Sequence, residues 1–296
     1  MMSVMHHLDV TAPDGRTLEV LAAESGDLPL VAHHGTPGAA DAYQPFADAA
    51  AQRGLRLVSY SRPGYGRSAP RPGRTVGSVV EDVATVLDAL GTDRFVTYGW
   101  SGGGPHALAC AALLPGRCLA SACIAGVAPA RAEGLDWLAG MGEENVEEFR
   151  AMAAGPDALS DWLTGAAAGL REVSADEIVT ALGDLLPEAD RAVLTGDFAE
   201  NMAAGMRHAL SAGIDGWLED DLAFDADWGF DLAAIERPVT VWQGSEDRMV
   251  PFAHGQWLAA HVSGASVRLL DGEGHLSLML GGGFERMLDD LLTAAG

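Results

Sequence analysis

The sequence predicts an α/β protein in which helices cover both faces of a mostly parallel sheet and a helical segment interrupts the sheet. Three observations lead to this fold class. Short apolar runs typical of buried strands alternate with helical stretches, this strand signal vanishes between residues 130 and 232, and it then returns. Alternating strands and helices form a parallel sheet. We therefore expect residues 1–129 and 233–296 to build one core, with residues 130–232 packed on it as a helical cap.

The first part of the chain opens with a predicted hairpin. Its strands, residues 7–10 and 17–22, flank Asp14-Gly15, a dipeptide typical of tight hairpin turns. The strands that follow are predicted at residues 30–33, 55–60, 95–98 and 119–124, with helices at 42–53, 75–90 and 102–114.

The last part of the chain resumes the same alternation after the insertion. Strands are predicted at residues 239–242 and 267–270, and helices at 252–261 and 276–292. Within the insertion, residues 146–152 and 199–210 have the spacing of amphipathic helices.

Composition and charge exclude several classes of partner. The chain of 296 residues is 48% hydrophobic, and its 18 basic residues, all Arg, face 42 acidic ones for a net charge of -24. This charge repels phosphate backbones and anionic lipids, so we expect a small-molecule substrate and no nucleic-acid or membrane partner. The first ten residues lack the segments of a signal peptide, which favours a cytoplasmic location. A monomer and a homodimer both stay open.

The three cysteines predict neither disulfides nor a metal site. Cys110, Cys118 and Cys123 form no CxxC motif and no Cys/His cluster. We expect buried thiols in a reducing compartment.

Residues 99–103, Gly-Trp-Ser-Gly-Gly, fit the GxSxG pattern of a nucleophile elbow. The pattern alone is weak, but it lies directly after a predicted strand and before a predicted helix, as the motif requires. Because so sharp a turn brings strand and helix together, the positions two before and two after the serine must lack side chains. We predict Ser101 as a nucleophile; the alternative is an incidental serine in a glycine-rich turn.

A serine hydroxyl needs an adjacent base, which predicts a histidine and an acid in the chain order Ser, acid, His. The histidines that follow the elbow and its helix are His208, His254, His261 and His275. The first three fall in the insertion or in predicted helices. His275 instead lies in a glycine-rich loop after the last predicted strand, where an α/β sheet holds catalytic groups. We predict His275 as the base.

Asp247 is the predicted acid. It follows the strand at residues 239–242 and lies between the serine and the histidine in sequence. Glu246 is its nearest rival. Asp271 is too close to His275 on the same loop, and the strand ending at Ile124 leads to no carboxylate.

The loop at residues 33–38 follows the first predicted buried strand, which begins at Leu30, and predicts one side of an oxyanion hole. We expect the backbone N–H of Thr36 to join that of Gly102, while Pro37 has no N–H to donate. His33 and His34 are expected to serve loop packing.

Together these motifs resemble the α/β-hydrolase superfamily, over nearly the whole chain. Residues 34–37, 62–68 and 99–103 and the loops of Asp247 and His275 occur in the family's order. The resemblance implies an α/β-hydrolase fold with an eight-stranded, mostly parallel sheet, a cap inserted after the sixth strand, and acyl transfer to water without a cofactor. The HGTPG loop also resembles the HGGPG of proline iminopeptidases, although the elbow departs from theirs.

The motifs favour a serine esterase that cleaves an ester, lactone or thioester of a small molecule through an acyl-enzyme on Ser101. One alternative is an aminopeptidase or amidase of the proline-iminopeptidase type. Another is non-hydrolytic chemistry, as a lyase or perhydrolase, or a binding-only protein on the same fold.

Substrate choice is expected to come from the insertion. It holds 23 acidic and 5 basic residues, which account for 18 of the 24 net negative charges. We expect these carboxylates to face water and the apolar side chains to pack on the core. Trp137, Trp162 and Trp217 are candidate substrate contacts. The alternative is that some carboxylates, such as those at residues 143–148, bind a substrate amine.

Overall fold

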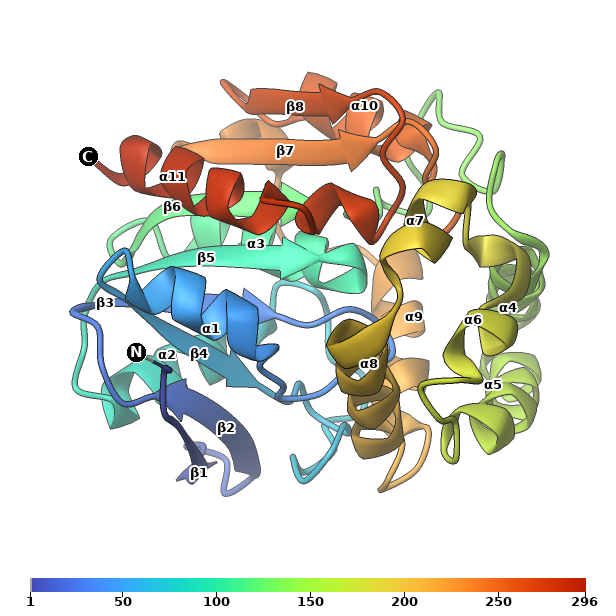
Figure 1. Ribbon diagram of the computed structural model, residues 1–296, viewed down its shortest axis with the longest axis horizontal. Helices are drawn as coiled ribbons and strands as arrows, with labels where there is room; N and C mark the ends of the chain where they lie inside the picture. Colours follow the sequence, from blue (N-terminus) through green and yellow to red (C-terminus); the bar gives the residue numbers. More distant parts are fainter. Residues whose placement is uncertain (1) are drawn as a thin grey trace.

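An eight-stranded sheet runs through the middle of the computed structural model, which describes residues 2–296 (Figure 1). Its strands are β1 (Met5–Thr11), β2 (Thr17–Ala23), β3 (Leu28–His33), β4 (Leu55–Tyr60), β5 (Phe95–Trp100), β6 (Cys118–Ile124), β7 (Val239–Gly244) and β8 (Ser266–Leu270). They are ordered β1-β2-β4-β3-β5-β6-β7-β8. The first two form the predicted hairpin and β2 pairs antiparallel with β4; all later neighbours are parallel. The predicted fold class is confirmed.

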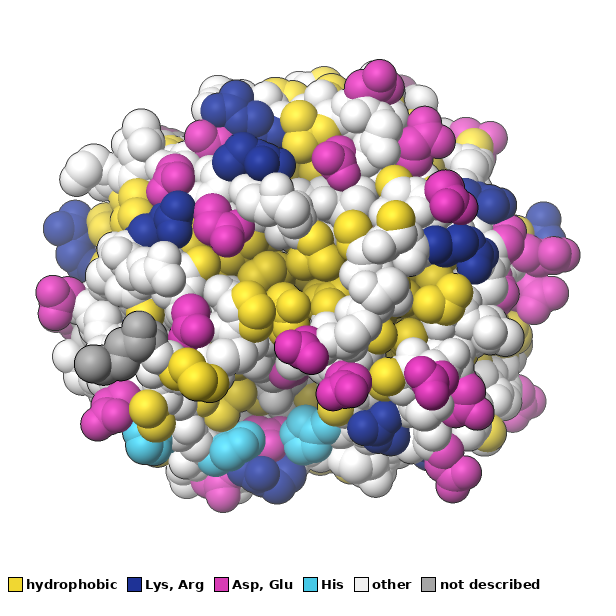
Figure 2. Space-filling view, viewed as in Figure 1, with side chains coloured by type: hydrophobic (Ala, Val, Ile, Leu, Met, Phe, Trp, Pro, Cys, Tyr) yellow, Lys and Arg dark blue, Asp and Glu magenta, His cyan; other side chains and the backbone are white. Residues whose placement is uncertain are grey.

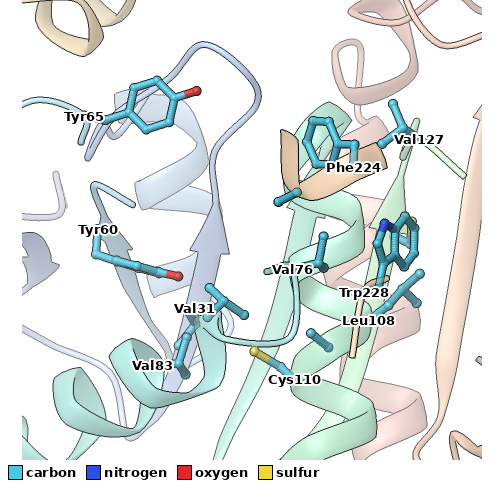
Figure 3. Close-up of a cluster of buried hydrophobic side chains, with 14 of the residues drawn as sticks. Val31, Tyr60, Tyr65, Val76, Val83, Leu108, Cys110, Val127, Phe224 and Trp228 are labelled. Carbon is cyan, nitrogen blue, oxygen red and sulfur yellow. The ribbon is translucent and has the colours of Figure 1, made fainter. Parts of the chain in front are cut away.

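Helices cover both faces of this sheet. They are α1 (Gln44–Ala51), α2 (Val79–Ala89), α3 (Gly104–Leu113), α10 (Phe252–His261) and α11 (Gly283–Ala295). α1 and α11 share a buried apolar cluster with one face, and α2, α3 and α10 share another with the opposite face. On the second face, Val31 of β3 and Tyr60 of β4 lie near Val83 of α2 (Figure 3). Within residues 2–296, no helix has both the length and the apolar character needed to cross a bilayer.

A helical segment, residues 130–232, follows β6 and packs over the carboxyl ends of the central strands (Figure 1). Every residue of this insertion is described, and none lies in a strand. Its elements are α4 (Glu143–Ala154), α5 (Pro156–Leu170), α6 (Ile178–Ala181), η2 (Gly183–Leu185), α7 (Glu188–Val193), α8 (Gly196–Ala209) and α9 (Asp215–Asp225), and η3 (Leu232–Ala234) closes it.

One predicted helix is split in two. The sequence predicts a continuous helix over residues 276–292, whereas the structure has a short 3-10 turn, η4 (Ser277–Met279), and then α11. Gly281 and Gly282, which separate them, have φ of 59° and 91°. These left-handed values end a right-handed helix and suit glycine. The prediction was wrong because the apolar spacing continues across the break.

The other differences are shifts of a few residues at the ends of helices and strands. The helix predicted from residue 75 begins at Val79, and the one predicted from residue 102 begins with a 3-10 turn, η1 (Ser101–Gly103).

Candidate active site

A cavity of about 1290 Å³ lies between the carboxyl ends of the strands and the insertion. Its lining includes four of the residues predicted for the chemistry: Thr36, Ser101, Gly102 and His275. Apolar side chains gather on the molecular face where α1 and α11 meet the insertion (Figure 2). Because Ser101 and His275 follow the carboxyl ends of strands, the cavity lies at the edge of the sheet where α/β proteins bind ligands.

Ser101 lies on the turn between β5 and α3. Its φ is 58°, in a region that residues other than glycine rarely adopt. A Cβ on Gly99 would overlap the carbonyl of Gly103, and one on Gly103 would overlap the carbonyl of His33. The close approach of strand, turn and β3 therefore explains both glycines, and the turn leaves Ser101 at the cavity wall.

His275 and Asp247 lie together although 28 residues separate them in sequence. The imidazole Nδ1 is 2.8 Å from Asp247 Oδ2, and both side chains are buried. The other carboxylate oxygen accepts the backbone N–H groups of Met249 and Val250 at 2.9 and 2.8 Å. These bonds fix the carboxylate toward the imidazole. The rival acid, Glu246, is exposed.

The surroundings of His275 favour its charged form. Burial lowers the pKa of His275, but the charge and hydrogen bond of Asp247 and the charge of Asp190 raise it, and the net shift is upward. Gln243 Nε2 also donates to Asp247 Oδ2 at 2.9 Å. The indole N–H of Trp100 donates to the carbonyl of His275 at 3.2 Å. The surroundings of His275 thus stabilise its protonated form, the imidazolium. This is the form that a histidine takes when it accepts a proton as a general base.

The loop after β3 brings Thr36 against Gly102. A Cβ on Gly102 would overlap the Thr36 hydroxyl, so the two predicted oxyanion donors belong to touching segments. The Thr36 hydroxyl donates to Asp220 Oδ2 at 2.7 Å. The guanidinium of Arg62 donates to the carbonyl of Gly35 at 3.0 Å. These contacts hold the loop in place from two sides.

His33, the last residue of β3, and His34 have their ring nitrogens engaged by neighbouring groups of the core. His33 Nδ1 lies 3.4 Å from the hydroxyl of Tyr60. His34 Nε2 accepts the backbone N–H of Arg62 at 3.1 Å, while its Nδ1 lies 2.7 Å from the carbonyl of Gly35. Burial, aided by the charge of Arg62, lowers the pKa of both, that of His33 to about 3. Both are therefore neutral at pH 7.

The structure corrects the expectation that the insertion's carboxylates face water. Four of them are buried: Glu148, Asp190, Asp220 and Asp221. A carboxylate leaves water only where hydrogen bonds, an opposite charge or a proton compensates it. Asp220, for example, lies 2.6 Å from the guanidinium of Arg62.

The spacing of residues along α9 could have predicted from the sequence that two of these acids are buried. Trp217, Asp220, Asp221 and Phe224 follow the spacing i, i+3, i+4 and i+7, and all four are buried on α9. This is the stripe that faces the core in an amphipathic helix. Acidic residues inside such a stripe indicate a buried polar site.

Glu148 of α4 and Asp221 of α9 form a carboxyl pair in the cavity wall. Burial raises the pKa of Glu148 to about 7, while burial and the charge of Glu148 raise that of Asp221 well above its usual range. The indole N–H of Trp217 donates to Glu148 Oε1 at 2.5 Å. Neither carboxylate oxygen of Asp221 has a hydrogen-bond donor among the described residues. The pair therefore holds a proton near neutral pH.

Only two of the three tryptophans predicted as substrate contacts reach the cavity. Trp162 and Trp217 line it. Trp137 does not: its indole N–H donates to the carbonyl of Ala128 at 2.7 Å, and its ring packs against Phe149 and His254. Trp137 therefore belongs to the packing of the insertion on the core.

The cysteines are free and buried, and burial raises the pKa of each thiol. Among residues 2–296, no three His, Cys, Asp or Glu side chains are grouped as metal ligands.

Comparison with known proteins gives a consistent picture. A family model described as alpha/beta hydrolase fold matches residues 29–282. A non-heme chloroperoxidase from Streptomyces lividans is 29% identical over 84% of this chain and 85% of its own length. A pimeloyl-[acyl-carrier protein] methyl ester esterase from Aromatoleum aromaticum is 29% identical over 75% of this chain and 81% of its own. A bromoperoxidase structure from Bacillus anthracis superimposes with a TM-score of 0.70, at 21% identity, over 97% of this chain and 100% of that one.

Proposed function

This chain belongs to the alpha/beta hydrolase fold family, and on that premise we propose that it is a serine esterase acting on a small carboxylic ester, lactone or thioester. Ser101 is the nucleophile, His275 the general base and Asp247 the acid that orients the base. One observation carries this assignment. A serine on a strained turn shares a cavity wall with a buried histidine whose Nδ1 lies 2.8 Å from a carboxylate.

The first half of the reaction forms an acyl-enzyme. His275 takes the Ser101 proton as Oγ attacks the substrate carbonyl, and the resulting oxyanion accepts hydrogen bonds from the N–H groups of Thr36 and Gly102. Collapse of this intermediate breaks the bond to the leaving alcohol, which receives the proton from His275. Asp247 stabilises the imidazolium meanwhile.

The second half returns the enzyme to its starting state. His275 takes a proton from water, whose oxygen attacks the acyl carbonyl, and the ester bond to Ser101 breaks. The carboxylic acid leaves, and Oγ regains its proton from His275. No other reactant is needed.

Covalent labelling combined with turnover tests this proposal. A fluorophosphonate probe should label Ser101 in the wild type, and a panel of acyl esters and lactones should identify a substrate. Ser101→Ala should lose labelling and lower kcat about 10⁴-fold or more. Full activity in Ser101→Ala would overturn the assignment.

Substrate choice is assigned to the insertion, which acts as the cap over the site. Trp162 and Trp217, with apolar side chains of α8 and α9, support an apolar acyl or alcohol group.

A second candidate, hydrolysis of an amine-bearing ester or amide, is favoured by the Glu148–Asp221 pair. This pair lines the same cavity as Ser101, and no guanidinium hydrogen-bonds to either carboxyl among the described residues. A substrate ammonium could replace the shared proton and remove the repulsion between the two groups.

A matched pair of substrates separates these candidates. The p-nitrophenyl esters of 6-aminohexanoate and heptanoate have similar chains, and only the first ends in a cation. If the pair binds an amine, kcat/KM for the cationic ester should exceed that for the neutral one, and Asp221→Asn should lower this ratio about tenfold. Glu147→Gln, on the exposed neighbour of Glu148, is the control. A wild-type preference for the neutral ester removes this candidate.

The names of two relatives, non-heme chloroperoxidase and non-heme haloperoxidase, favour a perhydrolase variant of the same chemistry. Hydrogen peroxide would then replace water as the attacking group, releasing a peracid and free Ser101. Addition of peroxide to an ester assay, with peracid measured, tests this variant. Absence of Ser101 labelling would instead favour a binding-only protein.

A further inference from the structure

Asp190, on α7 of the insertion, holds the loop that carries His275. Its Oδ2 accepts the backbone N–H of His275 at 2.8 Å, and its Oδ1 accepts those of Leu276 and Ser277 at 2.8 and 2.9 Å. The side chain is fully buried. We infer that Asp190 is a positioning residue for the base, supplied to the active site by the insertion.

Three successive backbone N–H groups of the His275 loop donate to this one carboxylate, which fixes a segment that has little regular structure of its own. The loop around His275 is glycine-rich and precedes the short η4 turn, so it has little regular structure. Gly274 also packs directly on Asp190, because a Cβ there would overlap the carboxylate. The Asp190 carboxylate thus fixes the position of the His275 backbone, and with it the position of the imidazole.

Asp190 also acts on His275 through its charge. Two charged groups raise the pKa of the imidazole: Asp247, which contacts Nδ1, and Asp190, which accepts the backbone N–H of His275. Arg191, the neighbour on α7, does not neutralise Asp190, because it donates to the carbonyls of Leu186 and Gly183. An ionised Asp190 therefore stabilises the imidazolium, in addition to fixing the loop.

This inference rests on the proposed role of His275, and it gives the insertion a second task. Besides covering the cavity, the insertion completes the support of the base. A displacement of α7 would then move His275 relative to Ser101, although α7 is more than 80 residues from either Ser101 or the loop in sequence.

Asp190→Asn tests the inference, because it keeps the shape of the side chain but loses its charge and one acceptor. The rate of fluorophosphonate labelling and kcat should fall about 10- to 100-fold, since small misplacements of a catalytic group have effects of this size. KM should change less than about threefold. The acid limb of the kcat/KM profile should move to lower pH, because the charge that raises the pKa of His275 is gone. Glu188→Gln, the exposed matched change on α7, should leave every value unchanged.

Gly274→Ala is the second variant, in case Asp190→Asn folds poorly. It leaves Asp190 in place but pushes the loop away from the carboxylate, and it should lower kcat while α7 stays intact. Labelling of the wild type separates a failure of the proposed esterase function from a failure of the role of Asp190. If the wild type is unlabelled, the proposed function fails. If the wild type is labelled and both folded variants keep its rates and pH profile, the role of Asp190 is overturned.

Discussion

Asp190 and Asp220 are two buried carboxylates of the insertion that hold opposite sides of the same site. Asp190, on α7, binds the loop of His275, whereas Asp220, on α9, binds the hydroxyl of Thr36 in the loop after β3, the proposed oxyanion loop. Both side chains are fully buried. The insertion thus contacts both of the loops to which we assign the chemistry.

The two carboxylates differ in what compensates their burial. Asp220 lies 2.6 Å from the guanidinium groups of both Arg62 and Arg74 and accepts the Tyr65 hydroxyl at 2.9 Å. Burial opposes its ionisation, but the two guanidinium charges hold its pKa well below the usual range. Asp190 has only backbone N–H partners, and burial raises its pKa. Asp220 therefore belongs to an ion cluster that supports stability, whereas the charge of Asp190 raises the pKa of His275, the proposed base.

The largest expected effect comes from breaking the ion cluster. Asp220→Asn leaves Arg62 and Arg74 buried without their counter-charge, so the free energy of unfolding should fall by about 3–5 kcal/mol. Asp190→Asn removes a carboxylate whose hydrogen-bond partners are backbone N–H groups, and it should cost about 1–3 kcal/mol. Urea denaturation at pH 7 measures both.

Asp215→Asn, an exposed change on the same helix as Asp220, should be nearly neutral. The comparison fails if Asp190→Asn proves as destabilising as Asp220→Asn.

The sequence was sufficient for the sheet and for the loops at its edge, because these depend on local patterns. Apolar runs predicted the strands, and Ser101, Asp247 and His275 each lie on the turn or loop that follows one. It was insufficient for Asp190 and Asp220. Their roles depend on which core loop each helix of the insertion meets, and charge counting treats a buried carboxylate like a solvated one.

Asp221 sharpens the comparison further, because it is adjacent to Asp220 but its pKa is shifted the other way. Its pKa is raised well above the usual range by burial and by Glu148. The folded state then binds a proton that the unfolded state has released, so stability falls as pH rises above the ordinary Asp range. Asp221→Asn removes this penalty, and its stability relative to the wild type should increase between pH 5 and 8.

The stability of the variant relative to the wild type should rise steadily with pH over this range, because the pKa of Asp221 is raised well above its usual range. Thermal denaturation at several pH values measures it. A loss of stability that is constant with pH would show that Asp221 is held as firmly as Asp220.

The smallest effect is expected at a third contact between insertion and core. His208 of α8 lies 2.9 Å from Glu19 of β2. Burial opposes ionisation of Glu19, but hydrogen bonds from His208, the Arg67 N–H and Ser61 lower its pKa to about 2, and Glu19 in turn raises the pKa of His208. The histidine's contribution is complete below its unfolded pKa of about 6.5 and is lost as pH rises through the higher folded value.

Because the His208 side chain is 34% exposed, solvent weakens this pair, and His208→Gln should cost about 0.5 kcal/mol at pH 6. The cost should disappear at pH 9, and His7→Gln, an exposed change, should show none at either pH. A loss of several kcal/mol that persists at pH 9 would mean that the packing of α8, rather than the ion pair, depends on this histidine. In that case the half-exposed His208–Glu19 pair would contribute as much to stability as the buried Asp220 cluster. The exposure of a contact between insertion and core would then not predict its contribution.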